Sequence, residues 1–306
     1  MPLVDFHTLM ADAEAGGYAV GYFESWDQHS LMAVADAADA LSAPVILGFS
    51  GIYLPHPDRI VRDPLALYGG MGLSVCRKLS VPACLLFNES PHEDWVVDAI
   101  GEGFNLVMFA EEGMPFDEAA PVIRRVCATA HPAGVAVEAE MASVPGVGGG
   151  MGEAPDEDPL TDPAEAAAFV ERTGIDALAV NLGQVHLHGR EKRTLDHPRL
   201  ERLRASVSVP LVLHGSTSVN ADDIARAAAG GIRKVNVGSA LKQAFFNATV
   251  QAAREVDPDA NPYEIVGSGL ANDVLTAGRR AMQEEVQRWM KLLGSAGRVE
   301  TQQRPG

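Results

Sequence analysis

The sequence of 306 residues has few aromatic residues, few cysteines and no long apolar run. No apolar stretch approaches the roughly 20 residues that cross a bilayer, and the amino terminus lacks the basic region and apolar core of a signal peptide. Cys76, Cys84 and Cys127 are odd in number and stand in apolar or helical contexts. This usage is typical of free thiols in a reducing compartment. We therefore expect a cytoplasmic protein with no membrane partner.

Positive charge is also scarce in this chain. Lys and Arg number 24 against 41 Asp and Glu, so the formal net charge is -17. Nucleic acids and anionic membranes attract basic surfaces, which argues against both as partners. A small anionic substrate is not excluded, because it needs only a few local hydrogen-bond donors.

Short apolar segments and amphipathic segments, by contrast, are abundant and alternate along the chain. Hydrophobic residues make up 47% of the sequence, enough for one large α/β domain or two ordinary ones. The segments with strand character are residues 18–23, 44–49, 81–87, 104–109, 135–140, 177–182, 209–214 and 232–237. The segments with helical character are residues 30–41, 64–79, 92–100, 116–129, 163–173, 198–205, 221–229, a long helix from residue 239, and 273–293.

This repetition predicts an α/β protein with the (β/α)8 TIM-barrel fold. The alternative, a doubly wound open sheet, would usually carry a glycine-rich fingerprint after its first strand, and residues 23–26 (Phe-Glu-Ser-Trp) stand there instead. We expect a single barrel domain over residues 1–296 with extra carboxyl-terminal helices. Residues 297–306 are polar and are expected to form a disordered tail.

Polar residues stand where the predicted strands end, and in such a barrel these positions share one site. They include Glu24, Ser50, Asn88, Glu89, Glu111, Glu140, His186, His214 and Asn236. Two histidines and several carboxylates at one mouth are costly to bury unless they are paired, protonated or bound to metal. A divalent cation satisfies them together, and this mixture of ligands suits zinc, and also manganese, iron or cobalt. His214 taken alone is equally consistent with a structural histidine.

Glu138 lies on the same strand face as Glu140, because side chains on a strand repeat with a period of two. For Glu138 we favour a buried ion pair over a functional role, and Lys234 on the eighth strand is a candidate partner.

Two segments carry the pattern of an anion site. Gly215, Ser216 and Thr217 follow the seventh strand, and Gly238 with Ser239 follows the eighth. Each segment opens a helix and exposes backbone N–H groups at its positive end, where barrels often bind phosphate. A carboxylate would fit equally well, and ordinary capping of two helices by serine is the alternative.

The longest loop covers residues 141–161 and is rich in glycine and acidic residues. Loops of this length are either active-site lids or disordered segments. We favour a lid, because the loop follows a strand at the carboxyl face, and Glu153 is its candidate acid/base.

Taken together, these segments resemble the class II, metal-dependent ketose-bisphosphate aldolases, which include the fructose- and tagatose-bisphosphate enzymes. The resemblance covers nearly the whole chain and rests on residues 17–21, 43–47, 135–140, 176–180, 210–215, 231–236, 279–282 and 294–297. It implies that His186 and His214 are two of three zinc-binding histidines and that Glu140 is a carboxylate beside the metal. It also implies that Asn236 contacts the substrate and that the loop from Gly215 is a phosphate loop.

The loop sequences depart from the family pattern. The family has Gly-Gly-Ser-Gly where this chain has Gly215, Ser216, Thr217 and Ser218, and its Thr-Asp after the eighth strand is Ser239 and Ala240 here. Phosphate recognition is therefore in question.

The third strand departs further from the family. Members end it with Leu-Asp-His-Gly, in which the Asp is the acid/base and the His is the third zinc ligand; this chain has Asn88 and Glu89. An amide cannot transfer the proton of aldol cleavage, whereas a glutamate still binds metal with a different Lewis acidity. Glu24 stands where the first strand of the family has Asn. The site thus loses one carboxylic acid and gains others, which favours a repurposed enzyme over an inactive one.

The sequence hypothesis is a lyase that works through a metal-stabilised enediolate on a sugar-derived hydroxy-ketone or keto-acid. Its metal ligands are Glu89, His186, His214 and Glu140, with Glu24 or Glu153 as acid/base and Asn88 as an orienting amide. Substrate contacts are expected from Ser50, Gly215, Ser216, Thr217, Asn236, Gly238 and Ser239. The alternatives are a metal-dependent epimerase, isomerase or decarboxylase, or an inactive homologue that binds a sugar or stabilises a partner enzyme. Family members are commonly dimers or larger, so a homodimer or homotetramer is expected.

Overall fold

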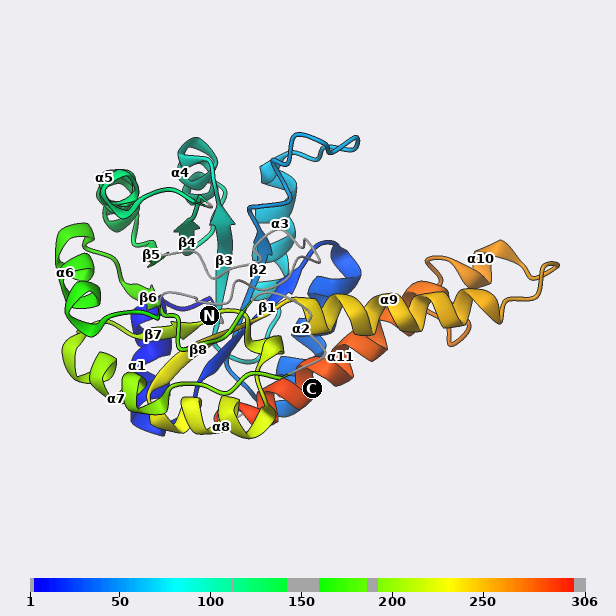
Figure 1. Ribbon diagram of the computed structural model, residues 1–306. Helices are drawn as coiled ribbons and strands as arrows, with labels where there is room; N and C mark the ends of the chain where they lie inside the picture. Colours follow the sequence, from blue (N-terminus) through cyan, green and yellow to red (C-terminus); the bar gives the residue numbers. More distant parts are fainter. Residues whose placement is uncertain (1–2, 112, 142–159, 186–191, 300–306) are drawn as a thin grey trace.

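The computed structural model describes residues 3–111, 113–141, 160–185 and 192–299. Parallel strands form a closed barrel in which each strand pairs with the next in sequence and β8 pairs with β1 (Figure 1). The strands are β1 (Val20–Ser25), β2 (Val45–Ser50), β3 (Ala83–Ser90), β4 (Leu106–Phe109), β5 (Ala136–Glu140), β6 (Ala177–Ala179), β7 (Leu211–Leu213) and β8 (Ile232–Val237). The predicted (β/α)8 fold is confirmed.

Side chains alternate between two apolar layers, as the strand period of two requires. In β1, Val20 and Tyr22 belong to the cluster inside the barrel, whereas Phe23 belongs to the cluster between strands and helices. Tyr22 lies opposite Ile46 on one side and Asn236 on the other. The inner face of β1 therefore runs from an apolar floor through Tyr22 to Glu24 at the carboxyl end.

Helices surround the barrel in the expected order. They are α2 (Gln28–Leu41), α3 (Leu65–Cys76), α4 (Glu93–Gly101), α5 (Phe116–Ala130), α6 (Pro163–Thr173), α7 (His197–Ser206) and α8 (Ala221–Gly230). Most bounds lie within a few residues of the sequence prediction. The cysteines Cys76, Cys84 and Cys127 are free and buried, as expected.

A helix that was not predicted from the sequence lies at the amino-terminal end of the barrel. This helix, α1 (Phe6–Gly16), begins at an N-cap aspartate, Asp5, whose carboxylate accepts from the backbone N–H of Thr8. Phe6, Leu9 and Met10 of α1 pack with the inner apolar cluster of the barrel. Helix α1 thus covers the amino-terminal end of the barrel, opposite the carboxyl ends of the strands where the predicted site residues lie.

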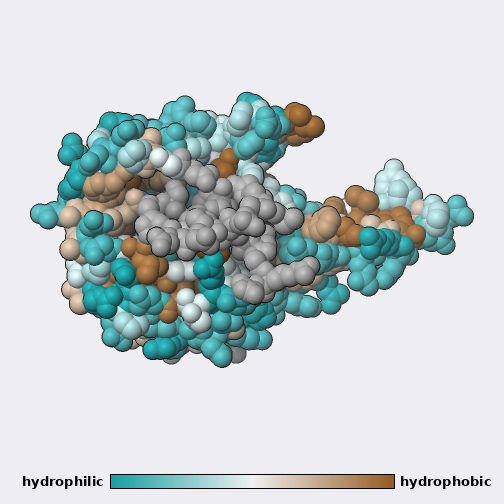
Figure 2. All heavy atoms as spheres, viewed as in Figure 1, coloured by the Kyte–Doolittle hydropathy of each residue, from teal (hydrophilic) through white to brown (hydrophobic). Residues whose placement is uncertain are grey.

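Three carboxyl-terminal helices form an arm. Helix α9 (Ser239–Arg254) packs against α11 (Val274–Leu292), and α10 (Pro262–Ile265) lies near the outer end of this pair (Figure 1). The base of α11 packs against α2, while the outer part of the pair projects away from the barrel. Apolar side chains gather on the projecting part (Figure 2). None of the helices in the described ranges has the length and apolar character needed to span a bilayer.

Some predicted features fall outside the described residues. These are most of the proposed lid with Glu153, the metal-ligand candidate His186, and residues 300–306 of the proposed tail. Residues 297–299 of that tail are described, and the N–H groups of Gly297 and Val299 donate to the carbonyls of Leu41 and Ser42.

Candidate active site

A cavity of about 70 Å³ lies at the carboxyl end of the barrel. Residues from the ends of strands β1, β3, β7 and β8 line it. They are Tyr22, Glu24, Asn88, Glu89, His214, Gly215, Ser216, Thr217, Asn236, Val237, Gly238 and Ser239. The volume is about that of two or three water molecules in the liquid, so this pocket fits the reacting end of a small molecule.

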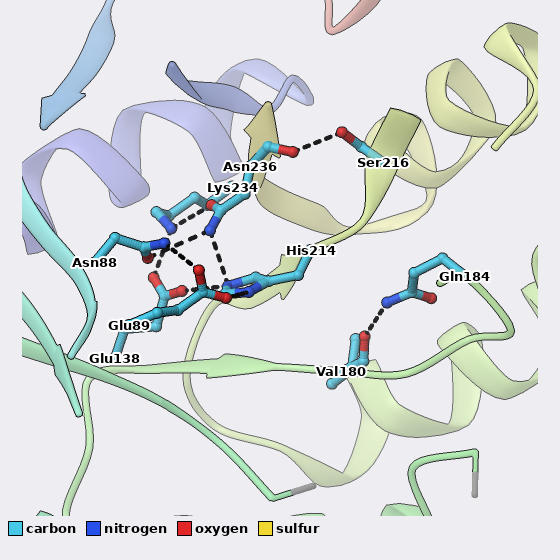
Figure 3. Close-up of polar contacts among 9 residues, drawn as sticks. All are labelled: Asn88, Glu89, Glu138, Val180, Gln184, His214, Ser216, Lys234 and Asn236. Carbon is cyan, nitrogen blue, oxygen red and sulfur yellow. Dashed lines mark hydrogen bonds and ion pairs between the residues drawn. The ribbon is translucent and has the colours of Figure 1, made fainter. Parts of the chain in front are cut away.

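His214 is the centre of the polar network around this cavity (Figure 3). Its side chain is fully buried, its Nδ1 lies 2.8 Å from Oε1 of Glu89, and its Nε2 lies 2.8 Å from Oε1 of Glu138. Burial lowers the pKa of His214, but the carboxylates of Glu89 and Glu138 outweigh it and raise this pKa to about 10. In the protein without ligand, the imidazole is therefore a cation held between two carboxylates.

Glu138 links His214 to the interior of the barrel. Its Oε2 lies 2.8 Å from Nζ of Lys234, and both side chains are fully buried. Burial raises the pKa of Glu138, but Lys234 and His214 together bring it below its ordinary value. The predicted buried ion pair between Glu138 and Lys234 is confirmed, and it fixes the carboxylate that orients the imidazole.

Asn236 completes this network above Lys234. The Nζ of Lys234 donates to Oδ1 of Asn236 over 2.5 Å. The amide nitrogen of Asn236 donates to Oδ1 of Asn88 over 3.5 Å and lies 3.0 Å from Nε2 of His214. The hydroxyl of Ser216 in turn donates to the carbonyl oxygen of Asn236 over 2.6 Å. Strand β8 and the loop after β7 are thus tied together at the cavity wall.

Glu89 adopts an unusual backbone conformation that directs its carboxylate into the barrel mouth. Its φ is 53°, in the left-handed region that residues other than glycine rarely enter. The register between β3 and β4 shifts between Phe87 and Ser90, so the irregularity is local to this strand end. The amide nitrogen of Asn88 donates to Oε2 of Glu89 over 2.7 Å. Strained residues are kept where their surroundings hold them, commonly at functional sites, and here the strain presents Glu89 to His214.

Glu24, near the end of β1, also lines the cavity. Its Oε1 is 2.6 Å from Nζ of Lys242 in α9, and 18% of its side chain is exposed. Its other carboxylate oxygen lies so close to Gly238 that a Cβ at that position would overlap it. Glycine at position 238 therefore makes room for the glutamate carboxylate.

The two predicted anion segments both line the cavity. Gly215 has φ 61° and precedes the short 3-10 helix Ser216–Ser218. The N-cap position of α9 is Gly238, and neither α8 nor α9 has a side-chain cap at its amino terminus. Serine capping of these two helices, the alternative considered above, is therefore wrong. Gly238 and Ser239, the N-cap and the first residue of α9, line the cavity, which suits an anionic or polar group of a ligand.

The structure places the remaining candidates as follows. Ser50 ends β2 opposite Asn88 in register and is buried, but it does not line the cavity. Glu140 ends β5, is half-buried and does not line the cavity either. Tyr22, which does line it, was missed. The period of two from Glu24 was the signal that could have found it.

The histidine nitrogen and the glutamate oxygen at the cavity are chemically suitable ligands for a divalent cation. Within the described ranges, no three His, Cys, Asp or Glu side chains form a group that could hold a metal ion. However, Glu138 contacts Nε2 of His214, as the carboxylate does in a carboxylate–histidine–metal arrangement. The other ring nitrogen, Nδ1, lies 2.8 Å from Oε1 of Glu89. A nitrogen and an oxygen placed in this way suit zinc and related ions, and His186 belongs to the segment that is not described.

A closed parallel barrel with its polar network at the carboxyl end belongs to the class of TIM-barrel enzymes. Sequence comparison narrows this class: the family "Fructose-bisphosphate aldolase class-II" matches residues 4–298. The chain belongs to the class II fructose-bisphosphate aldolase family, which makes it an aldolase-like lyase.

Individual relatives agree with this assignment. The fructose-bisphosphate aldolase of Thermus caldophilus is 29% identical, with 95% of this chain and 98% of the relative covered. That of Staphylococcus aureus is 31% identical, with 98% and 100% covered. Among solved structures, the YdjI aldolase from Escherichia coli K12 has a TM-score of 0.80 and 29% identity, covering 97% of this chain and all of that one. A putative fructose-1,6-biphosphate aldolase from Coccidioides immitis has a TM-score of 0.79 and 25% identity, with 96% and 97% covered.

Proposed function

We propose that the protein is a divalent-metal-dependent lyase that cleaves a sugar-derived hydroxy-ketone or keto-acid by a retro-aldol reaction. We further propose that this reaction is not the standard bisphosphate cleavage of the family. The observation that carries the proposal is the pair Asn88 and Glu89 at the end of β3. Glu89 places a carboxylate 2.8 Å from the imidazole of His214, and Asn88 contributes an amide where the resemblance implies the acid/base.

Glu89 and His214 would hold the cation, with Glu140 and His186 as further ligand candidates. A divalent cation at such a site polarises a carbonyl group and stabilises the negative charge that develops on its oxygen. Zinc suits a site of mixed nitrogen and oxygen ligands, and manganese, cobalt or iron would also be accepted. Glu138 keeps the imidazole of His214 in one orientation, because its Oε1 accepts the Nε2 proton.

Glu24 is our candidate for proton transfer within the described residues. Glu24 lines the cavity, and its Oε1 forms an ion pair with Lys242. A carboxylate in this position can take the proton of a substrate hydroxyl during cleavage and return it to the carbon product. Glu153 on the proposed lid is the other candidate for this role.

The remaining groups would bind and orient the substrate. The amide of Asn88 can hold a substrate hydroxyl but cannot accept its proton, and Asn236 presents its amide beside His214. The residues Gly215, Ser216, Thr217, Gly238 and Ser239 surround the cavity near the start of α9. Backbone N–H groups there would take a phosphate or a carboxylate of the substrate.

The arm supports a further part of the proposal, that the protein works as a homodimer or homotetramer. Phe246, Tyr263, Val266 and Leu270 on the arm are each more than half exposed, and exposed apolar patches of this kind mark interaction sites. The partner that we propose for this patch is a second copy of the same chain. Light scattering of the wild-type protein and of Phe246→Glu would test this, with a monomeric wild type as the contrary result.

The free cysteines support a cytoplasmic location.

The test of the proposed reaction is a substrate screen. Purified protein would be incubated with zinc, manganese or cobalt and with panels of phosphorylated and unphosphorylated keto-sugars and keto-acids, and products would be followed by mass spectrometry. We expect cleavage of a carbon–carbon bond that His214→Ala abolishes and that His56→Ala, an exposed control, does not affect. Conversion without cleavage would indicate an epimerase, isomerase or decarboxylase. Binding without conversion would indicate an inactive homologue.

A further inference from the structure

One tyrosine that lines the active-site cavity has a hydroxyl group outside the network around His214. Tyr22 lines the cavity, is 1% exposed and lies inside the barrel with Asn236 opposite it. Its hydroxyl is buried and has no hydrogen-bond partner among the described residues. Burying a hydroxyl without a partner destabilises the folded protein, because the group loses its hydrogen bonds to water. A phenylalanine would fill the same space without this cost, so the hydroxyl calls for an explanation.

The position of Tyr22 sets this hydroxyl apart from other buried ones. The hydroxyl of Ser25 is also buried without a described partner, but Ser25 does not line the cavity. Tyr68, another buried tyrosine, has a complete set of partners: its hydroxyl contacts Arg59 and Asp63, each over 3.2 Å. Among the described residues, the buried tyrosine hydroxyl without a partner thus belongs to a residue that lines the proposed reaction site.

The surroundings of Tyr22 favour a neutral hydroxyl that donates a hydrogen bond. Burial raises its pKa well above the ordinary value, and the carboxylates of Glu24, Glu89 and Glu138 raise it further. The Nζ of Lys234 lies 5.2 Å from the centre of the ring, on its face. This cation–π contact and the close packing of the barrel interior hold the ring in place.

We propose that the hydroxyl of Tyr22 donates a hydrogen bond to an oxygen of the bound substrate, which makes Tyr22 a substrate-contacting residue of this site. The substrate oxygen would be a hydroxyl or a carbonyl of a small hydroxy-ketone or keto-acid, so this inference rests on the proposed function. A buried donor that is fixed in position before the substrate binds is preorganised, and it stabilises the negative charge that develops on a substrate oxygen during the reaction. The same donor discriminates against molecules without an oxygen at that position, because its hydroxyl then stays unpaired.

The test compares Tyr22→Phe with the wild type and with Tyr68→Phe as a matched control. Each change removes one buried tyrosine hydroxyl, but only Tyr68 has described partners. The probes are dihydroxyacetone and dihydroxyacetone phosphate with added zinc or manganese, and exchange of their carbon-bound protons with deuterated water is followed by NMR. This readout reports proton removal from carbon and does not require the natural substrate.

We expect Tyr22→Phe to lower the exchange rate by about 10- to 100-fold, with a melting temperature equal to or above that of the wild type. Tyr68→Phe should show the opposite pattern, with a lower melting temperature and an unchanged rate. Exchange within twofold of the wild type in Tyr22→Phe would overturn the proposal, as would a melting temperature that falls as in Tyr68→Phe. No exchange by the wild type itself would instead count against the proposed function.

Discussion

The Oε1 of Glu89 lies 2.8 Å from Nδ1 of His214, and a left-handed backbone at Glu89 makes this approach possible. The contact joins the ends of β3 and β7, which are far apart in sequence. On the other side of the imidazole, Glu138 is held by Lys234. This arrangement leaves one imidazole nitrogen and one carboxylate oxygen facing each other at the barrel mouth, which is the basis of the proposed metal site.

Replacement of Glu89 by glutamine tests that site directly. Glutamine keeps the size of the side chain but removes the negative charge, and an amide oxygen is a weaker ligand for zinc than a carboxylate. We expect metal affinity to fall at least about tenfold, measured as metal content after dialysis against a buffered zinc solution. Glu93→Gln, on the surface in α4 and paired with Arg125, is the matched control. Equal metal content in the wild type, Glu89→Gln and Glu93→Gln would contradict the assignment of Glu89 as a metal ligand.

Asn88→Asp tests whether the protein is an ordinary aldolase that has only lost its acid/base residue. The amide nitrogen of Asn88 donates to Oε2 of Glu89, so an aspartate would bring a second carboxylate against the first one. Like charges at this distance repel, and Glu89 would lose the partner that orients it. We therefore expect no gain in kcat/KM on the protein's own substrate, and a loss of about tenfold or more. A large gain would show that position 88 still works as the acid/base site of the family.

Glu24→Gln tests the proposed proton transfer. The amide would keep a hydrogen-bonding side chain beside Gly238 but would not accept a proton. We expect kcat to fall by about 100-fold with a much smaller change in KM. Lys242→Met, which removes the partner of Glu24 and leaves the carboxylate in place, should have a smaller effect on kcat. If Glu24→Gln retains kcat within a few fold, Glu153 becomes the candidate acid/base.

The architecture could be predicted from the sequence because it depends on patterns that repeat. Apolar strands and amphipathic helices alternate along the chain, and the charged ends of the strands mark one edge. The pair of Glu138 and Lys234 was also predictable, because a carboxylate inside a barrel requires a cation. Helix α1 was missed because Phe6, Leu9 and Met10 pack into the end of the barrel, and it precedes the first repeat unit.

The details of the site were less accessible from the sequence. A sequence shows that Glu89 is present, but its φ of 53° and its contact with His214 depend on a local irregularity between β3 and β4. In the sequence, Tyr22 looks like any other residue of a barrel strand. Its distinguishing feature in the structure is a buried hydroxyl without a described partner. Such features arise from packing between distant segments, and no short-range pattern encodes them.

Lys234→Met tests how the interior network contributes to stability. Lys234 and Glu138 are both fully buried and form an ion pair, so the change leaves the Glu138 carboxylate with only His214 as its charged partner. Removal of one member of a buried pair costs about 3–5 kcal/mol, and we expect a loss of that order in urea unfolding. The double variant Lys234→Met with Glu138→Gln should recover part of this loss, because no unpaired charge remains. A single variant as stable as the wild type would show that His214 alone satisfies Glu138.

Asp273→Ala tests the start of α11 and carries a pH signature. Asp273 is the N-cap of this helix; it is buried, and it accepts from the N–H groups of Leu275, Thr276 and Gly269. Burial raises the pKa of this carboxyl, but the hydrogen bonds outweigh the effect and hold it below its ordinary value. A lowered pKa in the folded state stabilises the protein above the unfolded value of about 3.9, and this contribution is lost as the pH falls through the folded-state pKa.

At neutral pH, we therefore expect Asp273→Ala to lower the free energy of unfolding by about 1–2 kcal/mol, as the loss of an N-cap does. The difference from the wild type should shrink as the pH is lowered below about 4, because the wild-type carboxylate then becomes protonated. Urea unfolding of both proteins at several pH values measures this difference. Asp12→Ala, at an exposed position of α1, should show little change at any of these pH values. A difference that stays constant down to pH 3 would mean that the size of the Asp273 side chain, and not its charge, caps α11.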